Sequence, residues 1–561
     1  MQRIGSPEKL EEIRKAILEA RDPKASSIAI CAAPNCHALG NGAVVDAFEK
    51  EVKAQGLEGK VRVMATGCLG FCEMGPVVIV NPSNICYVQV GADDAAEIVS
   101  QVANGEKPIE RLLYADPDTG ERVEALDKIP FYREQSRILI GDNARIDPTS
   151  LEDYLAIGGY AALSKALFAM TPEAILDEVK ESNLRGRGGG GFPAGRKWET
   201  TRNAPGEEKY VIVNGHEGEP GAFMDRALFT GNPHLVLEGL IIGARAIGAT
   251  KGFIYTRHDS PMLLANLNRA LEQAREAGLL GNDILGSGFD FDVEVHFDVG
   301  IFVSGESSAL MRSLEGNMPE PRPKYVRTSV SGVNDMPSNL NNVETWANVP
   351  YIINNGVEWF AGMGTEKSNG SKLISLSGSA RNIGVVEVEM GTSLKTVVET
   401  IGGGVANGKK LKAVHFGGPM GGSIPGDMID TPLDFDELGK LGAPMGAGAL
   451  LVIDDETCMV SLTRYFVEFL TKESCGKCTP CREGMRQMLN ILNDICSGEG
   501  RPGDIERLEE IADTMSVASL CSLGKTAPDP LRSALRYFKA EYEAHINEKK
   551  CPAGDCAIEA N

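Results

Sequence analysis

The sequence predicts a multidomain α/β protein that ends in a helical bundle, and three observations support this fold class. At 561 residues the chain is too long for one core, because domains average about 150 residues. Strand-like and helix-like patterns alternate in residues 1–105 and again in residues 131–370. From residue 451 onward the apolar residues instead recur at helical spacing, as in 462–474 and 505–515. Length alone predicts three or four domains.

Residues 1 to about 105 carry the element order of a thioredoxin-like domain. A strand (26–30) runs into Cys31, a helix follows (42–56), and a second strand (61–66) leads toward Cys68. A hairpin (76–90) and a final helix (93–105) complete a βαβ–ββα order, which is the thioredoxin-like plan. The N-terminal stretch itself has the pattern of an amphipathic helix.

Two cysteine pairs follow strand ends in this first domain. Cys31 and Cys36 are five positions apart, and Cys68 and Cys72 are four apart. Both pairs leave the same edge of the predicted sheet, so four thiolates can converge there. These spacings favour a [2Fe–2S] cluster over the C-x2-C knuckles of zinc ribbons. Two redox-active disulfides are the alternative.

Residues 106–130 are charged and rich in turn-forming residues, with no sustained apolar period, which predicts a linker. A glycine-rich loop then stands out in residues 183–198, with six glycines in the ten residues 186–195. Missing Cβ atoms let a planar ligand and its phosphate approach the backbone, and exposed amides can cradle the phosphate. Arg187, Arg196 or Lys197 can add positive charge. Flexible linkers look similar, but here an amphipathic helix precedes the loop and a strand (209–214) follows it, which predicts a ligand-binding α/β domain.

Four cysteines near the C-terminus form the most specific pattern of the chain. Cys475, Cys478 and Cys481 are separated by two C-x-x-C steps, and Cys521 follows 40 residues later. Three local ligands and one remote ligand are typical of a [4Fe–4S] cluster. Four thiolates also suit tetrahedral zinc, although zinc sites more often pair two C-x-x-C knuckles.

The remaining cysteines suggest a further metal site. The tail (546–561) holds Cys551 and Cys556, His545 precedes it, and Cys458 has no partner nearby in sequence. Three cysteines and one histidine suit zinc, which would fasten the tail to the helical domain. Free buried thiols and a surface histidine are the alternative. Cys86 and Cys496 are interpreted as packing residues.

Composition excludes several functions. The net charge of −22 leaves no basic stripe to neutralise phosphates, so we expect no nucleic-acid partner. No apolar run approaches 18 residues, and no signal-peptide pattern is present, so we expect a cytoplasmic protein without membrane insertion. Thirteen cysteines in such a chain indicate metal or redox chemistry rather than structural disulfides.

Five motifs in order then carry a resemblance to a known family: GRGGGGF, EGEPG, GESSALMRSLEG, NNVETWANVP and ESCGKCTPCREG. Over residues 130–540 the chain resembles the NADH-binding flavoprotein subunit of respiratory complex I and its relatives in bifurcating hydrogenases and NAD-dependent formate dehydrogenases. The N-terminal ferredoxin resembles the hydrogenase-type arrangement. The resemblance implies an FMN-binding domain at 131–370, a ubiquitin-like (SLBB) module at 371–450, and a helical [4Fe–4S] domain at 451–545.

The resemblance also implies a flavin site and a nicotinamide site. The residues expected at the cofactors are Gly186, Gly188, Gly189, Phe192, Lys197, Asn214, Glu217, Phe302, Gly305, Glu306, Asn341, Asn342, Thr345 and Leu523. His216, Glu217 and Glu219 are expected at the reacting centre, with Glu219 positioning nicotinamide. Side chains near the flavin tune its potential.

Several positions depart from the family at the nicotinamide site. The family usually has Asp at His216 and a second Glu at Ser307, and its two adenine-packing aromatics align with Arg327 and Thr200, whereas Lys324 matches a family lysine. The loss of aromatic stacking on the adenine ring is expected to cost about 0.5–1.5 kcal/mol of binding free energy for each of the two aromatics. His216 brings a group that titrates near neutral pH beside the flavin.

Two functional hypotheses follow. In the first, FMN exchanges a hydride with NAD(H) and passes single electrons through the [4Fe–4S] cluster to partner iron–sulfur subunits, with bifurcation between two acceptors in some relatives. In the second, the chain keeps FMN and its clusters but has lost NAD(H) binding. It then relays electrons from ferredoxin or another flavoprotein, as a component of benzoyl-CoA reductase systems of anaerobes does.

Overall fold

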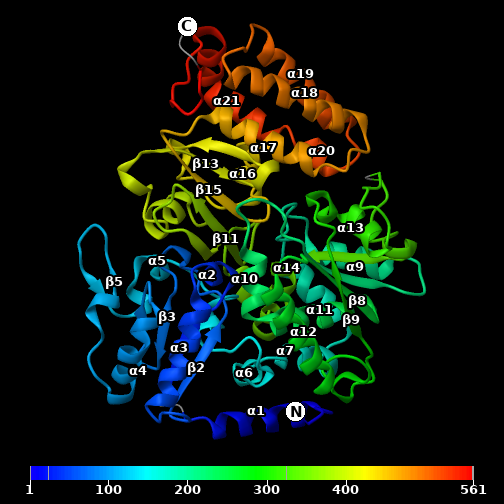
Figure 1. Cartoon of the computed structure of the whole chain (residues 1–561). Helices are drawn as coiled ribbons and strands as arrows, with labels where there is room; N and C mark the ends of the chain where they lie inside the picture. The colour runs from blue at the N-terminus through cyan, green and yellow to red at the C-terminus, as the bar shows by residue number, and fades with distance from the viewer. Residues whose placement is uncertain (1, 23–24, 324, 559–561) are drawn as a thin grey trace.

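The computed structural model describes residues 2–22, 25–323 and 325–558, so Lys324 lies outside the described residues. Figure 1 shows four parts: a ferredoxin-like part in blue, a green α/β domain beside it, a yellow sheet and an orange-to-red helical domain. The yellow sheet lies between the helical domain and the ferredoxin-like part, and the green domain borders both the yellow sheet and the helical domain. The multidomain α/β class expected from the sequence is confirmed.

The N-terminal domain is built on a four-stranded sheet in the order β2-β1-β3-β4. β1 pairs parallel with β2 and antiparallel with β3, which pairs antiparallel with β4. This is the predicted thioredoxin-like topology. The strands are β1 (Ser26–Cys31), β2 (Val61–Thr66), β3 (Val78–Asn81) and β4 (Ile85–Tyr87), and the helices are α1 (Pro7–Ala20), α2 (Pro34–Ala38), α3 (Asn41–Ala54) and α4 (Ala95–Asn104).

The segment expected to be a linker is folded onto this domain. It forms a short hairpin of β5 (Tyr114–Ala115) and β6 (Arg122–Val123). Leu112 and Leu113 are buried in the core of the ferredoxin-like domain, and Leu113 bridges to Tyr87 of β4. Residues 106–130 are therefore an extension that packs on this domain, with its apolar residues inward and most of its charged residues exposed.

Ion pairs and backbone hydrogen bonds fix the ferredoxin-like domain to its neighbours. The buried carboxylate of Asp153 lies 2.5 Å from Arg21 Nη2 and 2.8 Å from Arg62 Nη2. On the other side, the Val385 N–H donates to the Gly70 carbonyl over 2.8 Å. One domain edge is thus held by the α/β domain and another by the yellow sheet.

The α/β domain contains a fully parallel sheet in the order β10-β7-β8-β9. The strands are β7 (Tyr210–Gly215), β8 (Lys251–Thr256), β9 (Asp292–Phe297) and β10 (Ser338–Asn342). Its helices are α5 (Pro130–Arg133), α6 (Leu151–Ala156), α7 (Ala161–Phe168), α8 (Pro172–Glu181), α9 (Ala194–Asn203), α10 (Met224–Gly231), α11 (Pro233–Ile247), α12 (Pro261–Glu276), α13 (Ser307–Leu314), α14 (Val343–Asn355) and α15 (Val357–Ala361).

Helix α11 is buried along nearly its whole length and packs on α14. Two glycines make that contact possible. A Cβ at Gly239 would lie 2.0 Å from the Trp346 carbonyl oxygen, and one at Gly243 would lie 2.3 Å from the Trp346 ring. Close packing of this kind holds the strand ends, and the loops that follow them, in fixed positions.

The third part is a five-stranded sheet in the order β12-β11-β15-β13-β14. β11 pairs antiparallel with β12 and parallel with β15, and β13 pairs antiparallel with β15 and β14. Its elements are β11 (Ser371–Gly378), β12 (Gly384–Glu389), β13 (Leu411–Phe416), β14 (Gly422–Pro425), β15 (Ala449–Asp454) and α16 (Phe435–Lys440). The ubiquitin-like assignment of this module stays a prediction.

The C-terminal domain is helical, as expected. Its helices are α17 (Met459–Glu473), α18 (Thr479–Cys496), α19 (Asp504–Ala518), α20 (Ser522–Thr526) and α21 (Asp529–Glu543). They enclose a core of their own, with Met485, Met488 and Leu508 at its centre. Within the described ranges, no helix combines the length and the apolarity needed to cross a membrane.

Candidate functional site

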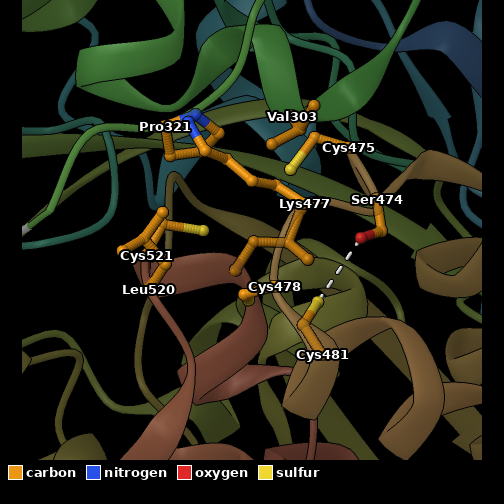
Figure 2. Close-up of a pocket in the computed structure, with 10 residues that line it drawn as sticks. Val303, Pro321, Ser474, Cys475, Lys477, Cys478, Cys481, Leu520 and Cys521 are labelled. Carbon is orange, nitrogen blue, oxygen red and sulfur yellow. Dashed lines mark hydrogen bonds between the residues drawn. The ribbon is translucent and has the colours of Figure 1, made fainter.

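The four cysteines of the C-terminal pattern line one pocket. Cys475, Cys478 and Cys481 come from the loop before α18 and its first turn, and Cys521 comes from the residue before α20. Figure 2 shows these two segments around one space, with Val303 and Pro321 above them in this view. The predicted three-plus-one ligand set is therefore assembled in space.

The chemistry of this pocket fits an iron–sulfur cluster. Burial raises the pKa of Cys481 to about 12 and that of Cys521 to about 11. Thiolates form here only beside a strongly positive centre, which cluster iron provides. The Ser474 hydroxyl accepts from the Gly476 N–H over 3.2 Å and lies 3.4 Å from Sγ of Cys481, so its own proton is free for that sulfur (Figure 2).

The N-terminal cysteines also converge. Sγ of Cys36 lies 3.1 Å from Sγ of Cys31, and contacts from the Cys36 and Cys68 thiols hold the pKa of Cys31 well below its usual value. Cys72 lies at the less buried side, where Asn35 Nδ2 is 3.7 Å from its sulfur. Four sulfurs from two strand ends suit a [2Fe–2S] cluster.

Cys458, His545, Cys551 and Cys556 meet as predicted, with their ligand atoms all within 4.8 Å of one another. Sγ of Cys458 lies 3.5 Å from His545 Nε2 and 3.7 Å from Sγ of Cys556. Donors around tetrahedral zinc are about 3.7 Å apart, given bonds of about 2.3 Å. His545 Nδ1 lies 2.7 Å from the Glu541 carbonyl, which leaves Nε2 to face the sulfurs. The donor set fits Zn²⁺.

The glycine-rich loop forms a cradle against two other segments. Gly188 lies so close to Asn342 that a Cβ would come within 2.9 Å of the Asn342 Cβ. Gly189 has φ +113 and bridges to Gly446, and Gly191 has φ +55. Any other residue at these positive-φ positions is strained. The Thr345 hydroxyl accepts from the Arg187 N–H over 2.9 Å and fixes the loop to α14.

Lys197 supplies a cation to this cradle, and no described carboxylate pairs with it. Its Nζ donates to the Leu340 carbonyl over 2.8 Å, beside Asn341. Burial lowers the pKa of Lys197 to about 8. A partly buried lysine with no acidic partner among the described residues fits an anionic ligand group, such as the FMN phosphate.

Three of the expected cofactor side chains are also structural. Both carboxylate oxygens of Glu217 accept hydrogen bonds, from the N–H groups of Asp225 (2.6 Å) and Arg226 (3.0 Å) and from Arg226 Nε. Glu306 caps α13 by accepting from Ser308 and Ala309, and Asn342 caps α14. Glu217 has φ +41, a left-handed conformation that is rare for a non-glycine residue. These residues therefore shape the cradle.

Glu219 differs from Glu217 because it is not satisfied. Its Oε1 is buried without a hydrogen-bond partner in the described part of the chain. Burial, followed by repulsion from Glu217, raises the pKa of Glu219 to about 7. A carboxyl group that is near neutrality and unpartnered is typical of a residue that awaits a ligand.

His216 lies directly after β7, and its ring packs under Gly218 and Gly305. A Cβ at Gly218 would come within 2.3 Å of the His216 ring. His216 Nε2 lies 3.2 Å from Asp298 Oδ2, and His258 Nδ1 lies 2.8 Å from Asp298 Oδ1. The sequence interpretation placed His216 beside the flavin but missed this carboxylate.

One short turn connects the cradle to the iron–sulfur pocket. In the turn 302–305, Gly305 accepts a hydrogen bond from Asn214 Nδ2 over 3.0 Å, whereas Val303 lines the cysteine pocket. The Phe302 N–H donates to Glu473 at the end of α17 over 2.6 Å. Leu523, expected at a cofactor, lies in the wall of the cysteine pocket.

The retained Phe192 and three of the departures, Arg327, Thr200 and Ser307, differ in exposure and contacts. Phe192 is 49% exposed and Arg327 is exposed, so both side chains are open to a ligand from solvent. Thr200 turns its hydroxyl back to the Arg196 carbonyl of its own helix. Ser307 donates to Glu306. Neither Arg327 nor Thr200 has an aromatic side chain.

Buried charges under the cradle were not foreseen from sequence. Lys372 forms an ion pair with Glu344, and Arg187 Nε lies 3.8 Å from the same carboxylate. All three side chains are fully buried. The sequence gives little indication of this ion pair, because a single lysine within a predicted strand, such as Lys372, is expected on the exposed face of the sheet.

Comparisons with known families match three segments. The Nuo51 FMN-binding domain matches residues 179–351, the NADH-ubiquinone oxidoreductase-F iron–sulfur binding region matches 461–545, and the thioredoxin-like [2Fe–2S] ferredoxin matches 17–103. Each segment contains one of the sites described above.

Relatives that match longer parts of the chain agree with these segments. The chain is 46% identical to the NADP-reducing hydrogenase subunit HndC of Solidesulfovibrio fructosivorans over 76% of this chain and 86% of that one. It is 40% identical to the F subunit of NADH-quinone oxidoreductase from Escherichia coli K12 over 72% and 91%. A chain in the crystal structure of an NAD⁺-reducing [NiFe]-hydrogenase in the H2-reduced state matches with a TM-score of 0.66 and 27% identity, covering 96% of this chain and 90% of that one.

Proposed function

The chain belongs to the family that contains the F subunit of NADH-quinone oxidoreductase and its hydrogenase relatives, and we propose that it passes electrons between a nicotinamide nucleotide and partner iron–sulfur subunits. It is an FMN- and iron–sulfur-dependent oxidoreductase subunit of a multi-subunit redox complex. The partners that accept or supply the electrons are part of the proposal.

The turn at residues 302–305 carries this proposal. It borders the glycine cradle through Gly305 and the cysteine pocket through Val303. Glu473, one residue before the cluster loop, fixes the backbone of the same turn. A flavin in the cradle and a cluster in the pocket would therefore share one wall, which is the arrangement that electron transfer between them needs.

The chain's own residues bind, orient and exclude water, and bound FMN supplies the conversion between two-electron and one-electron transfer. Lys197 and the loop amides hold the phosphate, and Asn214 orients the wall of the cradle. Glu219 offers its free carboxyl oxygen to the nicotinamide amide. Hydride transfer depends mainly on such positioning.

A relay without nicotinamide binding is the second candidate, and three departures from the family favour it. Thr200 and Arg327 provide no aromatic surface for adenine, and Ser307 offers only a short hydroxyl. In this case ferredoxin or another flavoprotein would be the donor, and Glu219 would have no nicotinamide to hold.

Anaerobic titration of the reconstituted chain with NADH, and separately with NADPH, distinguishes the two candidates. Stoichiometric bleaching of the flavin by either nucleotide supports the nicotinamide-linked oxidoreductase. A flavin that dithionite reduces but neither nucleotide reduces would refute the first candidate and favour the relay. Glu219→Gln is the matched variant, because it keeps the side-chain volume and removes the charge.

A further inference from the structure

Three adjacent parallel strands of the α/β domain end in a linked set of titratable side chains. His216 follows β7, His258 lies two residues after β8, and Asp298 follows β9. Because β7, β8 and β9 pair in register, their carboxyl ends meet at one edge of the sheet. Ligands of such sheets bind outside this edge.

Asp298 lies between the two imidazoles: it is hydrogen-bonded to His258 and lies within ion-pair distance of His216. One carboxylate oxygen faces His216 at 3.2 Å and the other faces His258 at 2.8 Å. The side chains of His216 and Asp298 are 4% and 1% exposed, whereas that of His258 is 58% exposed. Burial alone would raise the pKa of Asp298, but the close contacts with both histidines outweigh it and leave the pKa well below its usual value.

A buried carboxylate that stays ionised stabilises an imidazolium next to it. The Nδ1 side of the His216 ring, away from Asp298, lies against Gly218 and Gly305, and Gly305 borders the cradle through Asn214. A reduced flavin that carries one added proton has one more negative charge than the oxidised flavin. His216 is therefore placed between the Asp298 carboxylate, whose negative charge is constant, and the flavin site, where the negative charge would vary with the redox state of the flavin.

We propose that His216 takes up a proton when the flavin is reduced and returns it to solvent when the electrons leave, with Asp298 and His258 as positioning residues. This inference rests on the proposed function. Reduction of the flavin consumes two electrons and one proton, and in this protein a second proton from solvent binds His216. Oxidation by the cluster releases both protons, so the balance closes without another reactant.

Other charged groups face this set, and one of them is a rival. Glu217 is paired with Arg226, and Arg257 is paired with Asp259. Tyr255 stacks 6.3 Å from the His216 ring and stays neutral, because burial raises its pKa. Glu219 is near the cradle and has a pKa raised to about 7, so it is the second group able to take a redox-linked proton.

Spectroelectrochemical titration of flavin in the full chain with its cofactors tests the proposal. For a two-electron couple, each linked proton contributes about 30 mV per pH unit to the midpoint potential. Titrations run from about pH 5 to about pH 8, where imidazole changes charge. In the wild type, the midpoint potential of the flavin is expected to change with pH more steeply than in His216→Gln over part of this range. The difference in slope is expected to be about 30 mV per pH unit, and this part of the range is called the steep interval.

Three further variants separate roles. Asp298→Asn removes the stabilising charge and is expected to shift the steep interval to lower pH. In His258→Gln the Asp298 carboxylate would face only one imidazole, that of His216, so the steep interval is expected to shift to higher pH. The His258 side chain is exposed, so this variant should fold. Glu219→Gln is the control and is expected to retain the steep interval.

Equal slopes in the wild type and in folded, FMN-bound His216→Gln would overturn the proposal. Loss of the steep interval in Glu219→Gln alone would also overturn it, because Glu219 would then be the proton site. Neither result would affect the proposed function. A wild-type chain that takes up no FMN would overturn the proposed function itself, and this inference with it.

Discussion

Replacing Lys197 by methionine tests the flavin cradle through a partly buried cation that has no acidic partner among the described residues. Methionine keeps most of the side-chain length and removes the charge. Burial lowers the pKa of Lys197 from 10.5 to about 8, and each pKa unit equals about 1.4 kcal/mol, so a charged Lys197 without an anion beside it costs about 3 kcal/mol. The Leu340 hydrogen bond offsets about 1 kcal/mol of this cost. We therefore expect Lys197→Met to stabilise the flavin-free protein by about 2 kcal/mol near pH 7.

Flavin binding is expected to change in the opposite direction. A charged hydrogen bond to phosphate contributes about 1.5–3 kcal/mol, so Lys197→Met should weaken FMN binding by about 10-fold to 150-fold. In the wild type, a group with a pKa of about 8 is about nine-tenths protonated at pH 7 and about one-tenth at pH 9. Because bound phosphate requires the charged form, wild-type affinity should fall about tenfold over this interval, and the variant should show no such fall.

The sign of the stability effect follows from the same pKa. The folded state binds fewer protons than the unfolded state between about pH 8 and pH 10.5, so the flavin-free wild type gains stability as pH rises through this window. Fluorescence titration of deflavo-protein with FMN and urea unfolding at the same pH values measure both quantities. Unchanged FMN affinity in Lys197→Met, or a wild-type affinity that does not vary with pH, would refute the assignment of Lys197 to the phosphate.

Three further predictions concern the metal sites. Cys521→Ser should remove the EPR signal of one [4Fe–4S] cluster while FMN remains bound, whereas Cys86→Ser, a buried cysteine outside the ligand sets, should keep the iron content; iron retained in the first variant would exclude the assigned ligand. Ser474→Ala removes a hydrogen bond to Cys481, worth about 1 kcal/mol, and should lower the cluster potential by about 40 mV, with Ser474→Thr as the control and an unchanged EPR-monitored potential as the contrary result. Cys556→Ser should reduce the zinc content, measured by atomic emission, by about one equivalent and lower the melting temperature, and a wild type without zinc would contradict the site.

Local motifs made the cofactor sites predictable. Cys475, Cys478 and Cys481 are close in sequence, and the pairs at Cys31 and Cys68 follow predicted strands, so their spacing already contains the geometry. The tail site was predictable by elimination, because the leftover cysteines needed partners and zinc accepts that ligand set.

Long-range polar contacts were not predictable in the same way. Asp298 lies 82 residues after His216, and Glu473 lies 171 residues after Phe302, so neither pair has a sequence signature. The packing of Leu112 and Leu113 was missed because two apolar residues in a charged segment give no periodicity. Such contacts depend on which strand ends and domain faces meet, and this is a property of the tertiary fold.

The central claim is that flavin and the [4Fe–4S] cluster exchange electrons across the turn that Glu473 fixes. Freeze-quench EPR of the full chain, mixed anaerobically with excess nucleotide, tests it most directly. The account predicts that flavin bleaching is followed by a reduced [4Fe–4S] signal in the wild type, and that Cys521→Ser bleaches without this signal. The contrary result is a cluster that stays oxidised while the flavin is reduced and that only dithionite reduces. If the midpoint potential of this cluster lies above that of the flavin, this result would contradict the account.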